Sequence, residues 1–421
     1  MEAQAELDPL LKRWRVRIFA ATWLSYFGYY FCRKPFFITK ATLEEQLHWD
    51  AGQLSFLGVA FLAAYAIGQF IASAVGDRYG PRVLLLVGMA VTIAANVTFG
   101  LTNSWGLFAA LMVVNGLAQG TGWAGGVGSM GAWFNRRERG TVMGLWATNF
   151  QVGGIAANAL ASFALGQFGY EYAYFTGSAV LLVVWFVVLF HQRNRPEDVG
   201  LAPLVDPDEA VMAVKANGRV QWARAVVINV AILGVFYFFI KFIRYALWSW
   251  APYLLQRHYG LEGDEAGFLS TTFDLCGFAG VLALGVLSDR IFRGRRARLS
   301  MVFILGLAAS CVALYMFGQT SIAFFTACIG FMGFSLFGPD AILTSAGAVD
   351  VGSRAGATKA AGIINGIGSI GAVTQELVLG EVLKGGTRLD LVFGLLLASS
   401  LLAAGCLAVL LWRGRRGKAD V

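Results

Sequence analysis

The sequence predicts an all-α integral membrane protein with twelve transmembrane helices in two pseudo-two-fold-related six-helix bundles. Three observations predict this class. Of the 421 residues 57% are hydrophobic and only 14% are charged, whereas a soluble domain carries about 25% charged residues. The apolar runs are continuous and long enough to cross a bilayer as helices, unlike the short alternating strands of a β-barrel. One long polar stretch separates six of these runs from the other six.

Each predicted helix is one of these long apolar runs. In the first half they cover residues 16–38, 53–75, 82–101, 105–132, 138–165 and 171–191. In the second half they cover residues 225–252, 264–287, 298–318, 320–347, 355–382 and 388–412. The stretch between the halves contains Pro and acidic residues without an apolar period, which is typical of a linker. We therefore expect an N-terminal bundle over 1–191, a cytoplasmic linker over 192–224 and a C-terminal bundle over 225–421.

The basic residues orient the chain in its membrane. Most of the 33 Lys and Arg fall at the two termini and in the loops of one side, and the opposite loops hold only Lys40, Arg257, Lys384 and Arg388. By the positive-inside rule, both termini are expected to be cytoplasmic. The net charge of +8 therefore predicts no nucleic-acid partner. We expect a bacterial inner membrane, with an endomembrane as the alternative, and a retained first helix, because that run lacks a cleavage site.

The two halves resemble each other. "SAVGDRYGPR" (73–82) follows the second helix and "GVLSDRIFRGRR" (285–296) follows the eighth. The Asp-Arg pairs of these two segments are separated by nearly the same number of residues as Arg33 and Arg244, which lie in the first and seventh predicted helices. Two unrelated features at one offset indicate an internal repeat. Many transporters place a binding site near the membrane midplane, at the interface of such repeats.

Four basic residues lie within predicted spans: Arg33, Lys34, Lys241 and Arg244. A charge near the bilayer centre costs from about 3 to above 10 kcal/mol unless water or a partner relieves it. A guanidinium binds phosphate or carboxylate oxygens through two parallel hydrogen bonds. The matching arginines therefore predict an anionic ligand in a central cavity, the alternative being that each is paired with a buried acid. Lys34 is expected to pair with an acid or to reach the external surface.

The duplicated loop resembles the G-x-x-x-D-R-x-G-R-R motif of the major facilitator superfamily, with Ser73 in place of the first Gly. The resemblance covers essentially the whole chain and implies the twelve-helix fold of that family. It also implies that the motif residues gate the cytoplasmic side. These residues are Asp77, Arg78, Arg82, Asp289 and Arg290.

Further motifs resemble the organophosphate:phosphate antiporter family within that superfamily. They are Tyr-x-x-Arg-Lys in the first helix, Gly-Trp in the fourth, Trp-Phe-x-x-x-x-Arg-Gly after it and Arg-Tyr in the seventh. "CRKP" and "TGW" are closer to its sugar-phosphate exchanger branch. The resemblance implies that Arg33 and Arg244 grip the substrate phosphate and that Tyr30 lines the pore.

Two positions depart from the glycerol-3-phosphate transporters of the family. Gln69 stands where they have a Lys, and Phe150 where they have a pore His. Asn149 and Gln151 flank Phe150, and all three Gln and Asn positions are candidate substrate contacts. Lys241 lies one helical turn before Arg244, on the same face, and is expected either to replace the lost charge or to pair with Asp274. Trp123 is expected to pack between helices or to line the pore.

Few acidic residues lie within the spans. The resemblance implies that Asp274 is the counter-ion of Arg244 or Lys241 and releases them when substrate binds. Asp340 and Glu376 are expected to be either proton carriers, because burial favours a protonated carboxyl, or satisfied polar residues between helices. These three acids and Lys34 form the predicted charge-pairing set.

The resemblance and the charges together predict a secondary transporter that exchanges a sugar or glycerol phosphate for inorganic phosphate. It is expected to be a monomer in the lipid bilayer, without cofactor, metal or catalytic residues. One alternative is a sugar-phosphate sensor with a transporter fold, which would have a histidine kinase as partner. The other is a proton-coupled transporter of another organic anion. The sequence leaves open which solute is carried and in which direction.

Overall fold

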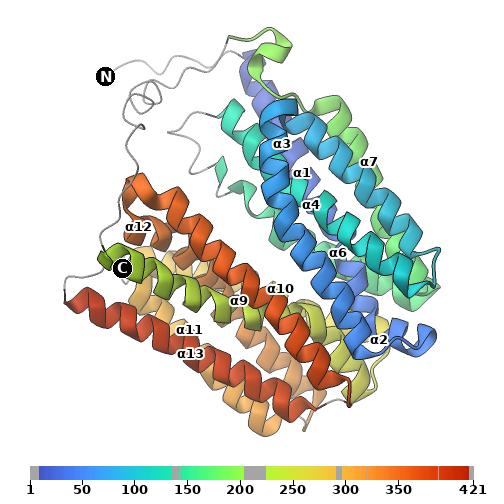
Figure 1. Cartoon of the computed structure of the whole chain (residues 1–421), viewed down its shortest axis with the longest axis vertical. Helices are drawn as coiled ribbons and strands as arrows, with labels where there is room; N and C mark the ends of the chain where they lie inside the picture. Colours follow the sequence, from blue (N-terminus) through green and yellow to red (C-terminus); the bar gives the residue numbers. More distant parts are fainter. Residues whose placement is uncertain are drawn as a thin grey trace. The chain divides into compact units, whose positions relative to one another are not determined.

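The structure is a computed structural model of the whole chain (Figure 1). It describes residues 9–134, 142–143, 145–202, 224–290, 296–318, 320–386 and 388–416. The side chains of all of these are described except those of residues 73–74, 77, 285–286, 288–290, 296, 342 and 344–362.

The described residues form helices joined by short turns. The first half contains α1 (Pro9–Phe31), α2 (Lys34–Leu47), α3 (Ala51–Phe99), α4 (Trp105–Trp133), α6 (Asn149–Phe168), α7 (Tyr170–His191) and the short 3-10 helix η1 (Pro196–Val199). The second half contains α9 (Arg224–Tyr259), α10 (Gly263–Arg290), α11 (Arg296–Phe317), α12 (Ile322–Leu383) and α13 (Leu389–Arg415). The all-α class predicted from the sequence is confirmed.

Ten stretches within the described helices are long and apolar enough to cross a membrane. Both α3 and α12 contain two of them: Ala51–Ala72 and Arg78–Phe99, and Ile322–Ala341 and Ile363–Leu383. Two of the twelve expected spans, the first and the fifth, fall outside this set. Their helices are more polar, since α1 begins with a basic stretch and α6 carries several Asn and Gln residues.

The first predicted span, 16–38, was wrong as a single helix. The structure ends α1 at Phe31 and resumes as α2 at Lys34, with a turn at Cys32 and Arg33. In this turn the backbone N–H of Arg33 donates to the carbonyl of Tyr30 at 3.0 Å. Pro35 explains the break, because proline has no N–H to donate to the carbonyl of Phe31 and its ring would clash with that carbonyl in a continuous helix.

The tenth and eleventh spans, predicted as 320–347 and 355–382, are not separated by a loop. The backbone is helical throughout α12. The residues between its two apolar stretches include Asp350, Arg354 and Lys359. The sequence therefore located the two spans, but it suggested a break that the structure replaces with helical backbone.

The chain forms two compact units. The first comprises Met1–Phe36 and Ala60–Gly218, and the second comprises Phe37–Val59 and Arg219–Val421. The segment Phe37–Val59 therefore packs with the second unit, although the chain on either side of it belongs to the first. The predicted domain and linker bounds place this segment in the N-terminal bundle, and they stay a prediction.

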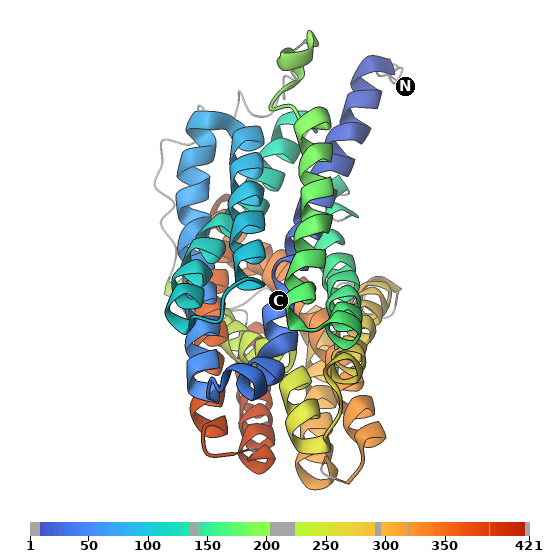
Figure 2. The same cartoon turned by 90° about the vertical axis from the view of Figure 1, so that its right-hand side faces the viewer.

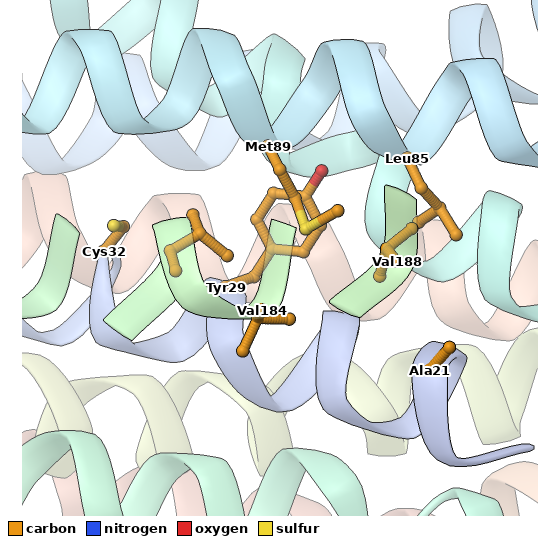
Figure 3. Close-up of a cluster of buried hydrophobic side chains, with 8 residues drawn as sticks. Ala21, Tyr29, Cys32, Leu85, Met89, Val184 and Val188 are labelled. Carbon is orange, nitrogen blue, oxygen red and sulfur yellow. The ribbon is translucent and has the colours of Figure 1, made fainter. Parts of the chain in front are cut away.

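In the first unit, α1 packs against α4, α6 and α7, and the long first helix lies beside α7 in Figure 2. A cluster of buried side chains joins α1 to α7 and to the second half of α3. Figure 3 shows it, with Tyr29 beside Met89 and Val184. Helices thus meet through small and medium apolar groups, which allow close packing.

The loop that carries the gating motif contains a sharp turn. Gly80 has a φ of +80°, a backbone conformation that favours glycine. Beyond the turn, the guanidinium of Arg82 donates to the carbonyl of Leu189 at 2.7 Å, and its backbone N–H donates to Asn194 at 2.9 Å. Arg82 therefore joins the motif to the end of α7. Gating by the motif stays a prediction, and the side chains of Asp77, Asp289 and Arg290 lie outside the described residues.

Candidate functional site

Arg33 lies at the break between α1 and α2, within a group of aromatic side chains. Its guanidinium carbon is 4.7 Å from the centre of the Tyr30 ring and 4.6 Å from that of Tyr65. The hydroxyls of Tyr26 and Tyr65 are 3.0 Å apart, which ties α1 to α3 beside it. The Arg33 residue is only 7% exposed. Tyrosine faces attract the cation without neutralising it, so this environment holds Arg33 in place and keeps its charge.

Gln119 of α4 fixes the orientation of Arg33. The Nε of Arg33 donates to the amide oxygen of Gln119 at 2.8 Å. The amide nitrogen of Gln119 donates in turn to the carbonyl of Cys32 at 3.2 Å and to the amide oxygen of Asn115 at 3.1 Å. Gln119 is fully buried. Because both of its polar atoms are engaged, its oxygen must face Arg33.

The other predicted members of this site lie in the same unit. Trp123 is 37% exposed, and its ring centroid lies 5.4 Å from that of Tyr26. Lys34 is 2% exposed and packs over Gly154 of α6 together with Tyr30. This burial contradicts the expectation that Lys34 reaches the external surface. Contact of substrate with Gln69 and Gln151, which are half-buried, and with Asn149, which is buried, stays a prediction.

Arg244 and Asp340 form an ion pair in the second unit. The Nη1 of Arg244 lies 2.6 Å from the Oδ2 of Asp340. The guanidinium also lies over the ring of Phe337, at 4.5 Å from its centre. The side chain of Arg244 is 20% exposed and that of Asp340 is 7% exposed. Asp340 thus has a cationic partner between α9 and α12. Its two predicted roles, satisfied polar residue and proton carrier, stay predictions, as does a counter-ion role for Asp274 of α10.

Lys241, one turn before Arg244, donates to two neutral oxygens of α12. Its Nζ lies 2.9 Å from the amide oxygen of Asn365 and 3.3 Å from the hydroxyl of Ser369. The ammonium also lies 4.9 Å from the centre of the Tyr237 ring. These hydrogen bonds hold Lys241 against α12. Whether it supplies a cation to the site or pairs with Asp274 stays a prediction.

Glu376 lies in a different cluster, together with Lys40, which the sequence analysis placed in a loop. Lys40 is helical in α2 and fully buried, and it forms an ion pair with Glu376, which is also fully buried. The loop assignment of Lys40 was wrong, because a single sequence does not reveal which polar residues are covered by distant helices. Glu376 thus has a cationic partner, and its two predicted roles, satisfied polar residue and proton carrier, stay predictions.

The sequence matches the Major Facilitator Superfamily over residues 18–376 and again over 233–420. The chain belongs to this superfamily. A solved D-xylose–proton symporter has the same fold, with a TM-score of 0.71 at 13% identity, covering 93% of this chain and 97% of the symporter. The chain is therefore a multi-pass membrane protein with the transporter fold of this superfamily, and it is not an enzyme.

Similarity to curated proteins identifies a narrower family within the superfamily. The chain is 28% identical to a probable hexose phosphate transport protein of Chlamydia pneumoniae, over 91% of this chain and 88% of the relative. It is 30% identical to sugar phosphate exchanger 3 of Bos taurus, over 77% of this chain and 73% of the relative. It is 26% identical to the membrane sensor protein UhpC of Salmonella typhimurium, over 90% and 88%. Within the superfamily, the chain belongs to the organophosphate:phosphate antiporter family.

Proposed function

We propose that this major facilitator exchanges a phosphorylated organic solute, a sugar phosphate or glycerol phosphate, for inorganic phosphate by alternating access. The proposal rests mainly on the observation that neighbouring side chains hold the guanidinium groups of two arginines in place. Arg33 lies in the turn between α1 and α2 and Arg244 lies on α9, and each has its guanidinium fixed by neighbouring side chains. Fixed guanidinium groups suit the bidentate recognition of phosphate. The relatives named as hexose phosphate transport protein and sugar phosphate exchanger support this substrate class.

Asp340 gives the site a way to respond to substrate. In the structure the carboxylate of Asp340 forms an ion pair with the guanidinium of Arg244. A phosphate group offers the same guanidinium more oxygens and more charge, and it competes with Asp340 for Arg244. Binding of phosphate therefore releases a carboxylate from α12 and changes how α9 and α12 are held together.

An excess of positive charge in the proposed site would prevent the empty carrier from changing from one side of the membrane to the other, so that it would do so only with an anion bound. Arg33, Lys241 and Arg244 bring three positive charges to the proposed site, and Asp340 pairs with Arg244. Without an anion, bringing these cations together in a closed intermediate is costly, because like charges repel strongly in a medium of low dielectric constant. A bound phosphate offsets this repulsion. The closed intermediate then forms with substrate or with inorganic phosphate but not empty, which makes the exchange obligatory.

The setting we propose is a bacterial inner membrane, with both termini cytoplasmic and the transporter acting as a monomer. The basic loops of one side support this orientation. The two acids proposed as alternative proton carriers, Asp340 and Glu376, are each engaged by a cation. Each of these carboxylates already has a cationic partner in the structure, which supports the exchanger over proton coupling.

A sensor is the second candidate, because the membrane sensor UhpC aligns over nearly the whole chain. Purified protein in detergent is tested for binding of sugar phosphates, and the same protein in liposomes for their uptake. The exchanger predicts both binding and uptake, with competition by inorganic phosphate. Binding with no uptake by folded protein would instead identify a sensor, for which a histidine kinase partner is expected.

Exchanging Lys241 for Gln is expected to raise the KM for phosphate about tenfold, because one charge-assisted hydrogen bond contributes about 1.5–3 kcal/mol. Lys241→Arg, which keeps the charge, is the matched control and is expected to retain most of the affinity. Initial rates of exchange over a range of phosphate concentrations measure both variants. An unchanged KM in Lys241→Gln would remove Lys241 from the site.

Gln119→Glu is expected to lower the affinity for phosphate at least tenfold. The new carboxylate would accept the hydrogen bond from Nε of Arg33 and neutralise the guanidinium that phosphate must bind, and hydrogen bonds to charged groups are the stronger ones. Gln119→Leu removes the anchor without adding charge, and we expect a smaller loss. A thermal-stability measurement on both variants separates folding from binding. Equal losses of affinity in Glu and Leu variants would mean that Gln119 only packs against Arg33.

A further inference from the structure

A cluster of aromatic and basic side chains lies at the ends of three helices of the first unit. Trp14 lies near the start of α1, Trp133 is the last residue of α4, and Arg193 lies just beyond the end of α7. The rings of Trp14 and Trp133 are stacked, with their centroids 6.2 Å apart. The indole N–H of Trp133 donates to the carbonyl of Arg193 at 3.1 Å. In Figure 2 the start of α1 and the end of α7 lie at the same end of this unit.

Two guanidinium groups flank Trp14. The guanidinium carbon of Arg17 is 5.1 Å from the centre of the Trp14 ring, and that of Arg193 is 5.7 Å from it. An aromatic face attracts a cation without neutralising it. Among the described residues, no ion pair involves either arginine. Two positive charges are therefore held around one indole.

Arg15 fixes the position of Trp14. It is buried, and its Nε donates to the carbonyl of Trp133 at 2.9 Å. Its guanidinium carbon also lies 5.3 Å from the centre of the Phe134 ring. The last carbonyls of a helix have no partner within it and favour a cation, so this bond ties the start of α1 to the end of α4. Trp14 is half-buried and Arg17 is exposed, which leaves the cluster preformed and accessible.

The cluster lies at the depth of the lipid headgroups. The apolar stretches of α4 and α7 that are long enough to cross a membrane end at Trp133 and His191. Arg193 follows directly after the second of them. Tryptophan is enriched at the boundary between hydrocarbon and headgroups, and arginine extends from it toward water. We therefore place Trp14 and its two arginines at this boundary.

The exposed face of α1 changes from basic to apolar along the helix. Arg13, Arg17, Ala20 and Leu24 are three or four residues apart and therefore share one face. The first three are exposed and Leu24 is half-buried. A phospholipid has the same order of chemistry, with a phosphate above its acyl chains. Its phosphate would lie at the arginines and its chains along the apolar residues.

The chemistry of the cluster favours an anionic phospholipid. Guanidinium groups bind phosphate oxygens through parallel hydrogen bonds. A zwitterionic headgroup also carries an ammonium group, which needs an acid or an aromatic ring, and the Trp14 ring already has Arg17 and Arg193 beside it. Phosphatidylglycerol has the phosphate without the ammonium. With both termini cytoplasmic, as proposed above, the cluster faces the leaflet whose anionic lipids attract basic segments.

We propose that Trp14, Arg17 and Arg193 form a binding site for the phosphate of an anionic phospholipid. A lipid bound there joins the start of α1 to the segment after α7. Because it binds the folded protein, it stabilises that state by mass action. The site lies at the opposite end of α1 from Arg33, and exchange by the folded protein does not depend on it.

Lipid binding to delipidated protein in detergent tests the site. Native mass spectrometry measures the affinity for phosphatidylglycerol and for phosphatidylcholine with the same acyl chains. We expect Arg17→Gln/Arg193→Gln to weaken binding of phosphatidylglycerol at least tenfold and to leave that of phosphatidylcholine unchanged. Arg224→Gln/Arg415→Gln is the matched control, since it removes two exposed arginines at the start of α9 and the end of α13. Equal losses in both double variants would overturn the site, because net charge alone would then explain the binding.

Thermal unfolding gives a second measurement. Phosphatidylglycerol is expected to raise the midpoint of the wild-type protein more than phosphatidylcholine does, and to raise that of Arg17→Gln less. Arg17 is exposed, so this single variant is expected to fold. Equal effects of the two lipids on the wild-type protein would contradict the proposal.

Inorganic phosphate distinguishes a lipid headgroup from a soluble anion. At millimolar concentration, compared with chloride at equal ionic strength, it is expected to leave phosphatidylglycerol bound. Displacement of the lipid by phosphate but not by chloride would contradict the lipid assignment and identify a site for soluble phosphate. None of these measurements involves uptake, so their outcome is independent of the proposed exchange.

Discussion

Replacing Arg33 by Ala is expected to abolish phosphate exchange while the protein still folds. Truncating one partner of a buried, hydrogen-bonded charge pair costs about 2–5 kcal/mol or more, which corresponds to at least a thirtyfold loss of affinity for the phosphate group. Tyr30, Tyr65 and Gln119, which contact Arg33, are neutral, so none of these three becomes an unpaired charge when Arg33 is removed. Uptake of labelled phosphate into liposomes measures the loss.

Two controls sharpen the Arg33 experiment. Arg17→Ala changes an exposed arginine of α1, the helix that ends shortly before Arg33, and is expected to leave exchange intact. Arg33→Lys keeps the charge but loses the planar fork that binds phosphate and the Nε bond to Gln119, and we expect it to remain at least tenfold impaired. Full activity in Arg33→Lys would mean that charge alone, without geometry, is what the site needs.

Replacing Arg244 by Ala is expected to abolish exchange and also to destabilise the protein. Asp340 is only 5% exposed, and breaking a buried ion pair by removing one partner costs about 3–5 kcal/mol. The double variant Arg244→Ala/Asp340→Asn removes the unpaired carboxylate and should recover most of that stability. Thermal unfolding follows stability, and phosphate uptake follows function.

The double variant separates the two roles of Arg244. If Arg244 binds substrate, Arg244→Ala/Asp340→Asn is stable but inactive. If Arg244 serves only to pair with Asp340, the double variant recovers exchange along with stability, which would contradict the proposal. Asp340→Asn alone is expected to lower the KM for phosphate, because a competitor for Arg244 has been removed.

Local relations within the site followed from the sequence because they depend on helical spacing. Tyr30 and Arg33 are three residues apart, as are Lys241 and Arg244, so each pair was expected to share a face. The structure places Arg33 against the Tyr30 ring. The break before Pro35 had a visible signal as well, since proline disfavours continuation of a helix. An uninterrupted apolar composition nevertheless favoured one long span.

Relations between distant helices did not follow from the sequence. Gln119 lies on α4 within a run of small residues, and its bond to Arg33 depends on how α4 packs against α1. Lys40 and Glu376 are far apart in sequence and carry no motif. Lys40 is followed by the polar run "TLEEQ", which favoured a loop, and only tertiary packing buries it. Charge count and periodicity reveal a buried cation, but they do not identify its partner.

The most direct test of the central claim is uptake of labelled phosphate into liposomes that contain the purified protein. One set of liposomes is loaded with unlabelled phosphate and the other with buffer alone. Obligatory exchange predicts rapid uptake only in the loaded set, abolished in Arg33→Ala and inhibited by external sugar phosphate. Equal uptake into loaded and empty liposomes would contradict exchange, because it would require the carrier to return without an anion.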